Sequence, residues 1–149
     1  MRVEILCWLL ALGFGAPEAA AQPASVAAPP AERRVALVIG NSEYLKAPLK
    51  NPVNDARVIR DALRPLNFEV MLAENATMRN MEKAVSAFAA AVRPGDVALV
   101  FYSGHGIQVG GENYLIPTDF EIESAADVPY KAYSATRLLE PPIFNSPEP

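Results

Sequence analysis

Cysteine is almost absent from this sequence of 149 residues, and histidine occurs only once. The one cysteine, Cys7, lies close to the amino terminus, so no disulfide can form within the chain. Zinc sites in proteins take most of their ligands from cysteine and histidine. With His105 as the only histidine, a metal site would have to rely on carboxylates, and we expect none.

Basic residues are too scattered to form a patch. The chain holds 13 lysines and arginines against 17 aspartates and glutamates, a formal net charge of −4. The basic residues occur singly or in pairs such as Arg33-Arg34. A protein that binds nucleic acid usually presents a basic patch or stripe, so we expect no nucleic-acid partner.

The amino-terminal apolar stretch is short. Residues 5–14 are mostly apolar, whereas a helix that spans a bilayer needs about 20 such residues. Arg2 before this stretch and the small residues 19–21 after it are typical of a secretory signal peptide and its cleavage site. We predict that residues 1–21 are a signal peptide whose removal takes Cys7 away, which leaves a periplasmic or secreted protein without a stable membrane anchor. An uncleaved amino-terminal anchor is the alternative.

The rest of the chain divides into three parts. Residues 22–32 are rich in alanine and proline without a periodic pattern, as in a flexible linker. Residues 33–140 carry the apolar patterns of a folded domain. Residues 141–149 contain four prolines, and we predict that this tail is disordered.

Three strands and two helices alternate in the first part of the domain. The strands are expected at residues 35–39, 68–72 and 97–102. The first and third are apolar throughout, without the polar alternation of a half-exposed strand. Helices are expected at residues 51–64 and 77–92, between successive strands. This alternation is typical of βαβ units, so we predict an α/β fold with a mostly parallel sheet.

Each helix begins with residues suited to a helix start and shows one apolar face. Asn51 precedes Pro52 in the first helix, and Thr77 opens the second. Apolar residues recur at three- and four-residue steps, and we interpret the methionines among them as core residues. The predicted faces consist of Val53, Ala56, Ile59, Leu63 and Leu66 in the first helix and of Met78, Met81, Val85, Phe88 and Val92 in the second.

The pattern changes after the third strand. Residues 107–109 and 113–116 flank Gly110-Gly111, which predicts a hairpin with a two-glycine turn. The acidic segment Asp119–Asp127 is interpreted as a solvated loop, with weak calcium binding as the alternative. A further helix is expected to begin near residue 133.

The tetrad Ser103-Gly104-His105-Gly106 follows the third strand directly. Ligands and catalytic groups of open parallel sheets gather at the carboxyl ends of the strands. We expect the flanking glycines to let the backbone bend and to leave the Gly106 N–H free to face a substrate oxygen. The alternative is a histidine that only packs against the strand end.

Two other functions for this segment are weaker. The glycine spacing of residues 104, 106 and 110 is one residue longer than the dinucleotide-binding motif, and a hairpin follows where that motif needs a helix. Ser103 lies two residues from His105, but no third group is identifiable to complete a serine peptidase site.

Three ordered blocks of the sequence carry a family resemblance: RRVALVIGNSEY, PLKNPVNDARVIRDAL and RPGDVALVFYSGHGIQVGGENYLIPTD. They resemble the caspase-like fold of clan CD, C14-type peptidases, and within it the bacterial metacaspase-like p20 domain. The resemblance covers roughly residues 33–140. It implies a three-layer sandwich and a cysteine-type endopeptidase that acts on peptide or protein substrates. We expect no cofactor.

The resemblance also implies roles for individual residues. His105 would be the general base and later the general acid, and the Gly106 N–H would be an oxyanion-hole donor. Asp55 in NPVNDA matches an aspartate that helps form a pocket for a basic P1 residue in metacaspases. Its alternative is an acid favoured by the helix dipole. Pro52 departs from the family, because many metacaspases have a cysteine there.

The main departure from the family pattern concerns the nucleophilic cysteine. The family places a cysteine in a DACR-like segment on the next parallel strand, roughly 50 residues after the histidine, and this sequence ends at Pro149. We therefore predict a peptidase domain that lacks its nucleophilic cysteine, is inactive as it stands, and has a sheet that is incomplete on its C-terminal side. A partner strand could complete the sheet. The alternatives are a non-enzymatic pseudopeptidase module that binds peptides or a partner in the periplasm, and a fragment of a longer active enzyme.

Overall fold

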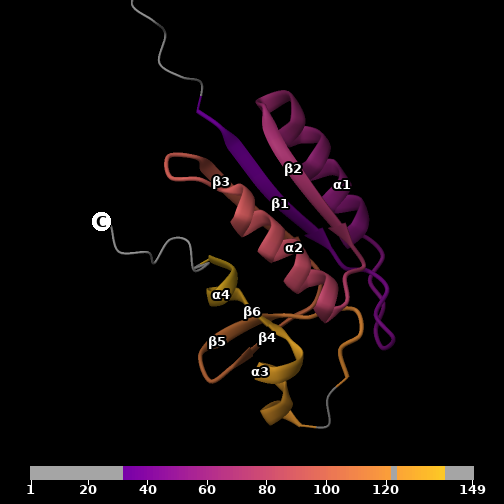
Figure 1. Cartoon of the computed structure of the whole chain (residues 1–149). Helices are drawn as coiled ribbons and strands as arrows, with labels where there is room; N and C mark the ends of the chain where they lie inside the picture. The colour runs from indigo at the N-terminus through magenta and orange to yellow at the C-terminus, as the bar shows by residue number, and fades with distance from the viewer. Residues whose placement is uncertain (1–31, 122–123, 140–149) are drawn as a thin grey trace, which may run out of the picture. The chain divides into compact units, whose positions relative to one another are not determined.

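The computed structural model describes residues 32–121 and 124–139 (Figure 1). The predicted signal peptide at 1–21, almost all of the linker at 22–32 and the tail at 141–149 lie outside the described residues. Among the residues that are described, no helix is long and apolar enough to cross a membrane.

A parallel sheet of three strands forms the centre of the domain. The strands β1 (Arg34–Gly40), β2 (Phe68–Glu74) and β3 (Val97–Ser103) stand in the order β2-β1-β3. They start level with one another, since Arg34 of β1 is paired with the first residues of β2 and β3. Residues 35–39 are fully buried in the central strand, as the continuous apolar run predicted. The predicted α/β fold and parallel sheet are confirmed.

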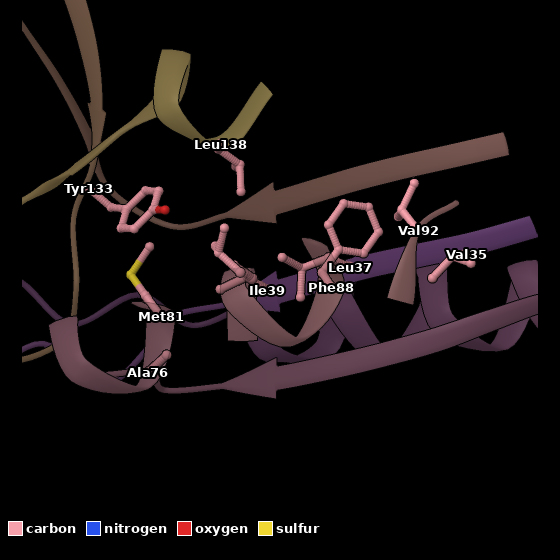
Figure 2. Close-up of a cluster of buried hydrophobic side chains, with 10 residues drawn as sticks. Val35, Leu37, Ile39, Ala76, Met81, Phe88, Val92, Tyr133 and Leu138 are labelled. Carbon is pink, nitrogen blue, oxygen red and sulfur yellow. The ribbon is translucent and has the colours of Figure 1, made fainter. Parts of the chain in front are cut away.

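The two long helices cover opposite faces of the sheet and make three layers. Successive side chains of a strand point to opposite faces, so β1 contributes to two separate cores. Val35, Leu37 and Ile39 pack toward α2 (Met78–Ala91), whereas Ala36 and Val38 pack toward α1 (Pro52–Leu63). Figure 1 shows the two helices on either side of the sheet. The α2 side includes Met81, Val85, Phe88 and Val92, and several of these side chains are drawn in Figure 2. The interpretation of this helix face as core is confirmed.

The prediction that Leu66 belongs to the apolar face of α1 is wrong. Leu66 is 54% exposed because the helix ends at Leu63 and the chain continues as a short 3-10 turn, η1 (Arg64–Leu66), which contains Pro65. A proline cannot donate the backbone hydrogen bond that would continue the α-helix. The turn ends at Asn67, which has a left-handed φ of 62°.

The helix starts differ from each other. Thr77 caps α2 as predicted: its hydroxyl accepts the Asn80 N–H at 3.3 Å. Asn51 stands at the N-cap position of α1, but its backbone is already helical and its side chain makes no capping bond. A cap residue normally has extended backbone angles, which aim its side chain at the first turn. The hydroxyl of Ser42, from the loop after β1, accepts the Val53 N–H instead at 3.2 Å.

A second, smaller sheet follows β3. The predicted hairpin is confirmed as β4 (Gly106–Val109) and β5 (Glu112–Leu115). Gly110 and Gly111 both have positive φ, 60° and 85°, as a two-residue type I′ turn requires. The segment then passes through η2 (Ala125–Asp127) and α3 (Val128–Lys131).

The helix expected from residue 133 begins later. Tyr133–Ser134 form a short strand, β6, which pairs with β5, and α4 covers only Ala135–Leu139. Tyr133 is 5% exposed and belongs to the α2-side core together with Leu138 (Figure 2). Burial of this ring in the core, together with pairing to β5, outweighs the local helical pattern.

Candidate active site

Three loops meet beyond the carboxyl ends of the parallel strands, and one buried asparagine links them by hydrogen bonds. Asn41, fully buried after β1, accepts the Ala76 N–H at 2.8 Å through its Oδ1 atom. Its amide nitrogen donates to the Ile116 carbonyl at 3.1 Å. Asn41 thereby connects the loops after β1 and β2 to the segment that follows the hairpin.

Two tyrosines hold the backbone around the candidate histidine. The Tyr102 hydroxyl lies 2.8 Å from the His105 carbonyl and 3.0 Å from the Ile116 carbonyl. The Tyr44 hydroxyl accepts the His105 N–H at 2.9 Å and lies 3.2 Å from the Tyr102 hydroxyl. Burial raises the pKa of Tyr102, so this hydroxyl stays protonated and remains a donor.

Gly104 is required by close packing. A Cβ atom at this position would lie 2.5 Å from the Tyr44 hydroxyl and 2.6 Å from the Tyr102 hydroxyl. The chain bends at Gly104, but neither Gly104 nor Gly106 has a positive φ, so a left-handed backbone is not the reason for glycine at these positions. The pair of tyrosine hydroxyls leaves no room for a side chain at position 104.

The imidazole of His105 is held on two sides. Its ring lies 4.5 Å from the Tyr44 ring, centroid to centroid, at an angle of 55°. Its Nε2 atom lies 2.8 Å from the Ala47 carbonyl oxygen. A carbonyl can only accept, so Nε2 carries the proton of this bond. In the neutral ring, Nδ1 is then the basic nitrogen, and it has no hydrogen-bond partner among the described residues.

The Ala47 carbonyl is a functional group that the sequence reasoning missed. Ala47 has a φ of 56°, in the left-handed region that a non-glycine residue enters at a cost of about 1 kcal/mol or more. A backbone carbonyl leaves no mark in the choice of residue. Only the fold brings the loop after β1 within hydrogen-bonding distance of the strand-end histidine.

The Gly106 N–H points away from the hairpin partner. The Ile116 N–H donates to the His105 carbonyl at 3.0 Å, and Gly106 is paired with Leu115. In an antiparallel pair, hydrogen-bonded and non-hydrogen-bonded positions alternate. Gly106 and Leu115 therefore form a non-hydrogen-bonded pair, whose N–H and C=O groups face outward. Gly106 itself is exposed.

Asp55 reaches the same edge of the sheet from α1. Its Oδ2 atom accepts the Ser103 hydroxyl at 3.3 Å, which places the carboxylate beside the end of β3. Asp55 is exposed. The structure thus brings together the three predicted site residues Asp55, His105 and Gly106 at the carboxyl edge, with their roles still predictions.

A cavity of about 330 Å³ opens beside the histidine. Sequence reasoning did not predict it, because its walls come from three separate segments of the chain. The lining is mostly apolar and does not include Asp55. It consists of Tyr44, Lys46, Ala47, His105, Ile116, Phe120 and Glu121.

The acidic segment after the hairpin contributes helix caps. Asp119 accepts the Met78 N–H at the start of α2 at 2.9 Å. Asp127 accepts the Ser124 N–H at 3.0 Å in a capping box. Within residues 32–121 and 124–139, no group of three or more acidic, histidine or cysteine side chains is placed to hold a metal ion. Weak calcium binding by this segment stays an untested prediction.

Comparison with known proteins places residues 33–138 in a family described as the caspase domain of C14 peptidases. The mucosa-associated lymphoid tissue lymphoma translocation protein 1 of Homo sapiens is 36% identical over 92 residues, which is 61% of this chain and 11% of that protein. Its homolog from Mus musculus is similar to the same extent. The chain therefore spans only a small part of the curated relatives that it matches.

Proposed function

Because this chain belongs to the caspase family of C14 peptidases, we propose that it supplies the histidine half of a cysteine-type endopeptidase site. The observation that carries this proposal is the hydrogen bond of 2.8 Å between His105 Nε2 and the Ala47 carbonyl. It leaves Nδ1 as the base, on a ring that Tyr44 holds in place. A histidine that merely packed against the strand end would not need an oriented ring.

The proposed reaction begins with a proton transfer. Nδ1 of His105 takes the proton of a cysteine thiol, and the thiolate attacks the carbonyl carbon of the substrate. The Ala47 carbonyl stabilises the resulting imidazolium through Nε2–H. The outward N–H of Gly106 donates to the oxyanion that forms. The imidazolium then returns its proton from Nδ1 to the leaving amine, and water releases the acyl group from sulfur with the same histidine as base.

The thiol is not part of the described site. The only cysteine, Cys7, precedes the segment that matches the family and lies outside the described residues. With a base and an oxyanion donor but no nucleophile, the sequence shown is proposed to be inactive by itself. The activity would then need a cysteine from a longer form of the chain or from a partner.

A basic residue is the proposed substrate feature before the cleaved bond. Asp55 is an exposed carboxylate at the same edge as His105, and the Ser103 hydroxyl orients it. An arginine or lysine side chain there would form an ion pair with it. This preference corresponds to the metacaspase-like branch of the family. We propose separately that the protein is exported to the periplasm or the cell exterior, because residues 1–21 are typical of a signal peptide.

A non-enzymatic binding module is the second candidate. Within the part of the chain that the structure describes, β3 pairs only with β1, so one edge of this strand offers unpaired backbone groups. The strand sequence VALVFYS has no charge or proline that would protect an edge. A partner strand could therefore add to it.

Two measurements test these proposals. The purified chain is expected to show no turnover of fluorogenic peptides with arginine or lysine before the cleaved bond, and turnover that survives His105→Ala would show that the assigned site is wrong. Binding of acetyl-arginine amide, followed through the His105 imidazole signal, is expected to weaken about two- to fivefold in Asp55→Asn, as for an exposed ion pair. Glu82→Gln, an exposed acid of α2, is the matched control.

The binding module has its own test. Size-exclusion chromatography of the chain is expected to show self-association through the free β3 edge. Ala98→Lys, at an exposed position of this strand, should reduce it. A monomer with a cooperative thermal transition would count against the edge as a binding surface.

A further inference from the structure

We propose that the cavity beside His105 binds the side chain of the substrate residue that follows the cleaved bond, and that it selects an uncharged apolar side chain of leucine or phenylalanine size. This inference rests on the proposed function, because it takes His105 as the group that protonates the leaving amine. It adds a second specificity site to the one proposed at Asp55.

The walls of the cavity define the size and polarity of the occupant. Tyr44 and Ile116 are 7% and 6% exposed, so they form a floor that the rest of the domain supports from behind. Phe120 is partly buried and supplies an aromatic wall. The volume of about 330 Å³ is at the lower end of the range for ligand pockets. It accommodates one large side chain rather than an extended segment.

The charged residues of the lining favour a neutral occupant. Lys46 and Glu121 carry opposite charges, and neither forms an ion pair with another described residue. One positive and one negative side chain add no net charge to the lining, so the cavity carries no charge of a single sign that would select an acidic or a basic side chain. Their polar ends can instead hydrogen-bond to the carbonyl and N–H groups of a peptide backbone, which leaves the apolar lining to the side chain.

The position of the cavity relative to His105 identifies which substrate residue it receives. His105 lines the cavity, whereas Ser103 and Asp55, which bond to each other at the strand end, do not. A peptide whose basic side chain meets Asp55 must bring its cleaved bond to the imidazole. The leaving amine belongs to the next residue, and the side chain of that residue is the one within reach of the cavity.

The experiment uses the single histidine of the chain as its probe. Acetyl-Arg-X-amide dipeptides, with X as phenylalanine, leucine, alanine or aspartate, are titrated into untagged protein while the His105 Cε1–H signal is followed by NMR. We expect the phenylalanine and leucine peptides to bind about tenfold more tightly than the alanine peptide, because the larger side chain is partly removed from water. The aspartate peptide should bind no better than the alanine peptide.

Variants of the cavity wall distinguish binding at this site from nonspecific hydrophobic binding. Phe120→Ala is expected to reduce the tenfold preference for the phenylalanine and leucine peptides over the alanine peptide to about twofold or less. Phe120→Leu keeps an apolar wall, and it should lower the affinity for the phenylalanine peptide relative to the leucine peptide. Tyr130→Ala is the control, because Tyr130 is an aromatic residue of α3 that is 84% exposed. Circular dichroism confirms that each variant is folded.

The outcomes separate the two proposals. Equal binding of the phenylalanine and alanine peptides, while Asp55→Asn still weakens both, would overturn the cavity assignment and leave the proposed function standing. Preference for phenylalanine that Phe120→Ala does not change would place the apolar subsite elsewhere and also overturn the assignment. If no dipeptide perturbs the His105 signal, the proposed function and the cavity site fail together.

Discussion

At the scale of single residues, the site depends on atoms that approach one another closely. The hydroxyls of Tyr44 and Tyr102 lie where a side chain at position 104 would begin. The same hydroxyls bond to the backbone of His105. Packing and hydrogen bonding at this point therefore cannot be changed independently.

Substitution of Gly104 tests this packing. Gly104→Ala is expected to destabilise the domain by about 1–3 kcal/mol, because the new methyl group must displace two hydrogen-bonded hydroxyls. Gly106→Ala is the matched control: its Cβ would be 3.5 Å from the nearest atom, the Tyr114 carbonyl oxygen, an ordinary contact. Urea unfolding of both variants measures the difference, and equal midpoints would contradict the packing argument.

The tautomer of His105 is a second test at this scale. The bond to the Ala47 carbonyl predicts that the neutral ring carries its proton on Nε2. Long-range ¹H–¹⁵N NMR distinguishes the two tautomers, and the single histidine makes the assignment unambiguous. A ring protonated mainly on Nδ1 would rule out the proposed base.

At the scale of secondary-structure elements, one carboxylate joins the small sheet to the last helix. Glu112 of β5 accepts the Ser134 hydroxyl and, at 3.0 Å, the Thr136 hydroxyl. The Thr136 N–H donates to the same side chain at 3.3 Å. These hydrogen bonds, first of all that from Ser134, lower the pKa of Glu112. α4 is thereby attached to β5 by a charged acceptor.

This attachment predicts an effect of acid. A carboxylate whose pKa is lowered by folding stabilises the fold fully above its unfolded pKa, about 4.3, and loses that contribution as the pH falls through the folded value. We expect the protection factors of the α4 amides, which correct the exchange rates for the pH dependence of intrinsic exchange, to fall as the pH is lowered below about 4. Glu112→Gln should lower these protection factors already at neutral pH and leave them nearly independent of pH, whereas unchanged protection in this variant would exclude the role.

At the scale of the whole domain, buried polar groups connect the main sheet to the segment that follows the hairpin. Asn41 is fully buried and bridges the Ala76 N–H and the Ile116 carbonyl. Ile116 also lies next to the hairpin and lines the cavity. The geometry of His105 and that of the cavity therefore depend on the same buried amide.

Removal of the Asn41 side-chain amide should weaken the connection between the main sheet and the segment after the hairpin. Asn41→Ala is expected to cost about 2 kcal/mol of unfolding free energy, because the buried Ala76 N–H loses its partner and the Ile116 carbonyl loses one of its donors. The spectrum of the His105 ring should change at the same time, since the hairpin begins beside it. Val58→Ala, at an α1 position that is 66% exposed, is the control for both measurements. A folded Asn41→Ala variant with unchanged stability would contradict the bridging role.

Local sequence patterns were sufficient to predict the parallel sheet, the two helices and the hairpin. Each of these depends on local patterns: unbroken apolar runs such as residues 35–39, helical spacing such as Met81, Val85 and Phe88, and a Gly110-Gly111 turn. The sequence also placed His105 at a strand end, because a motif marks that position. Such features can be read from neighbouring residues alone.

The hydrogen bonds that orient His105 and the cavity beside it depend on the folded arrangement of the chain. The Ala47 carbonyl, the packing of Tyr44 and Tyr102 against Gly104, and the cavity bounded by Phe120 all join segments far apart in the chain. The start of α4 was mistaken for the same reason, since the burial of Tyr133 in the core outweighs its local pattern. Contacts of this kind arise from the path of the folded backbone, which leaves no periodic signal in the sequence.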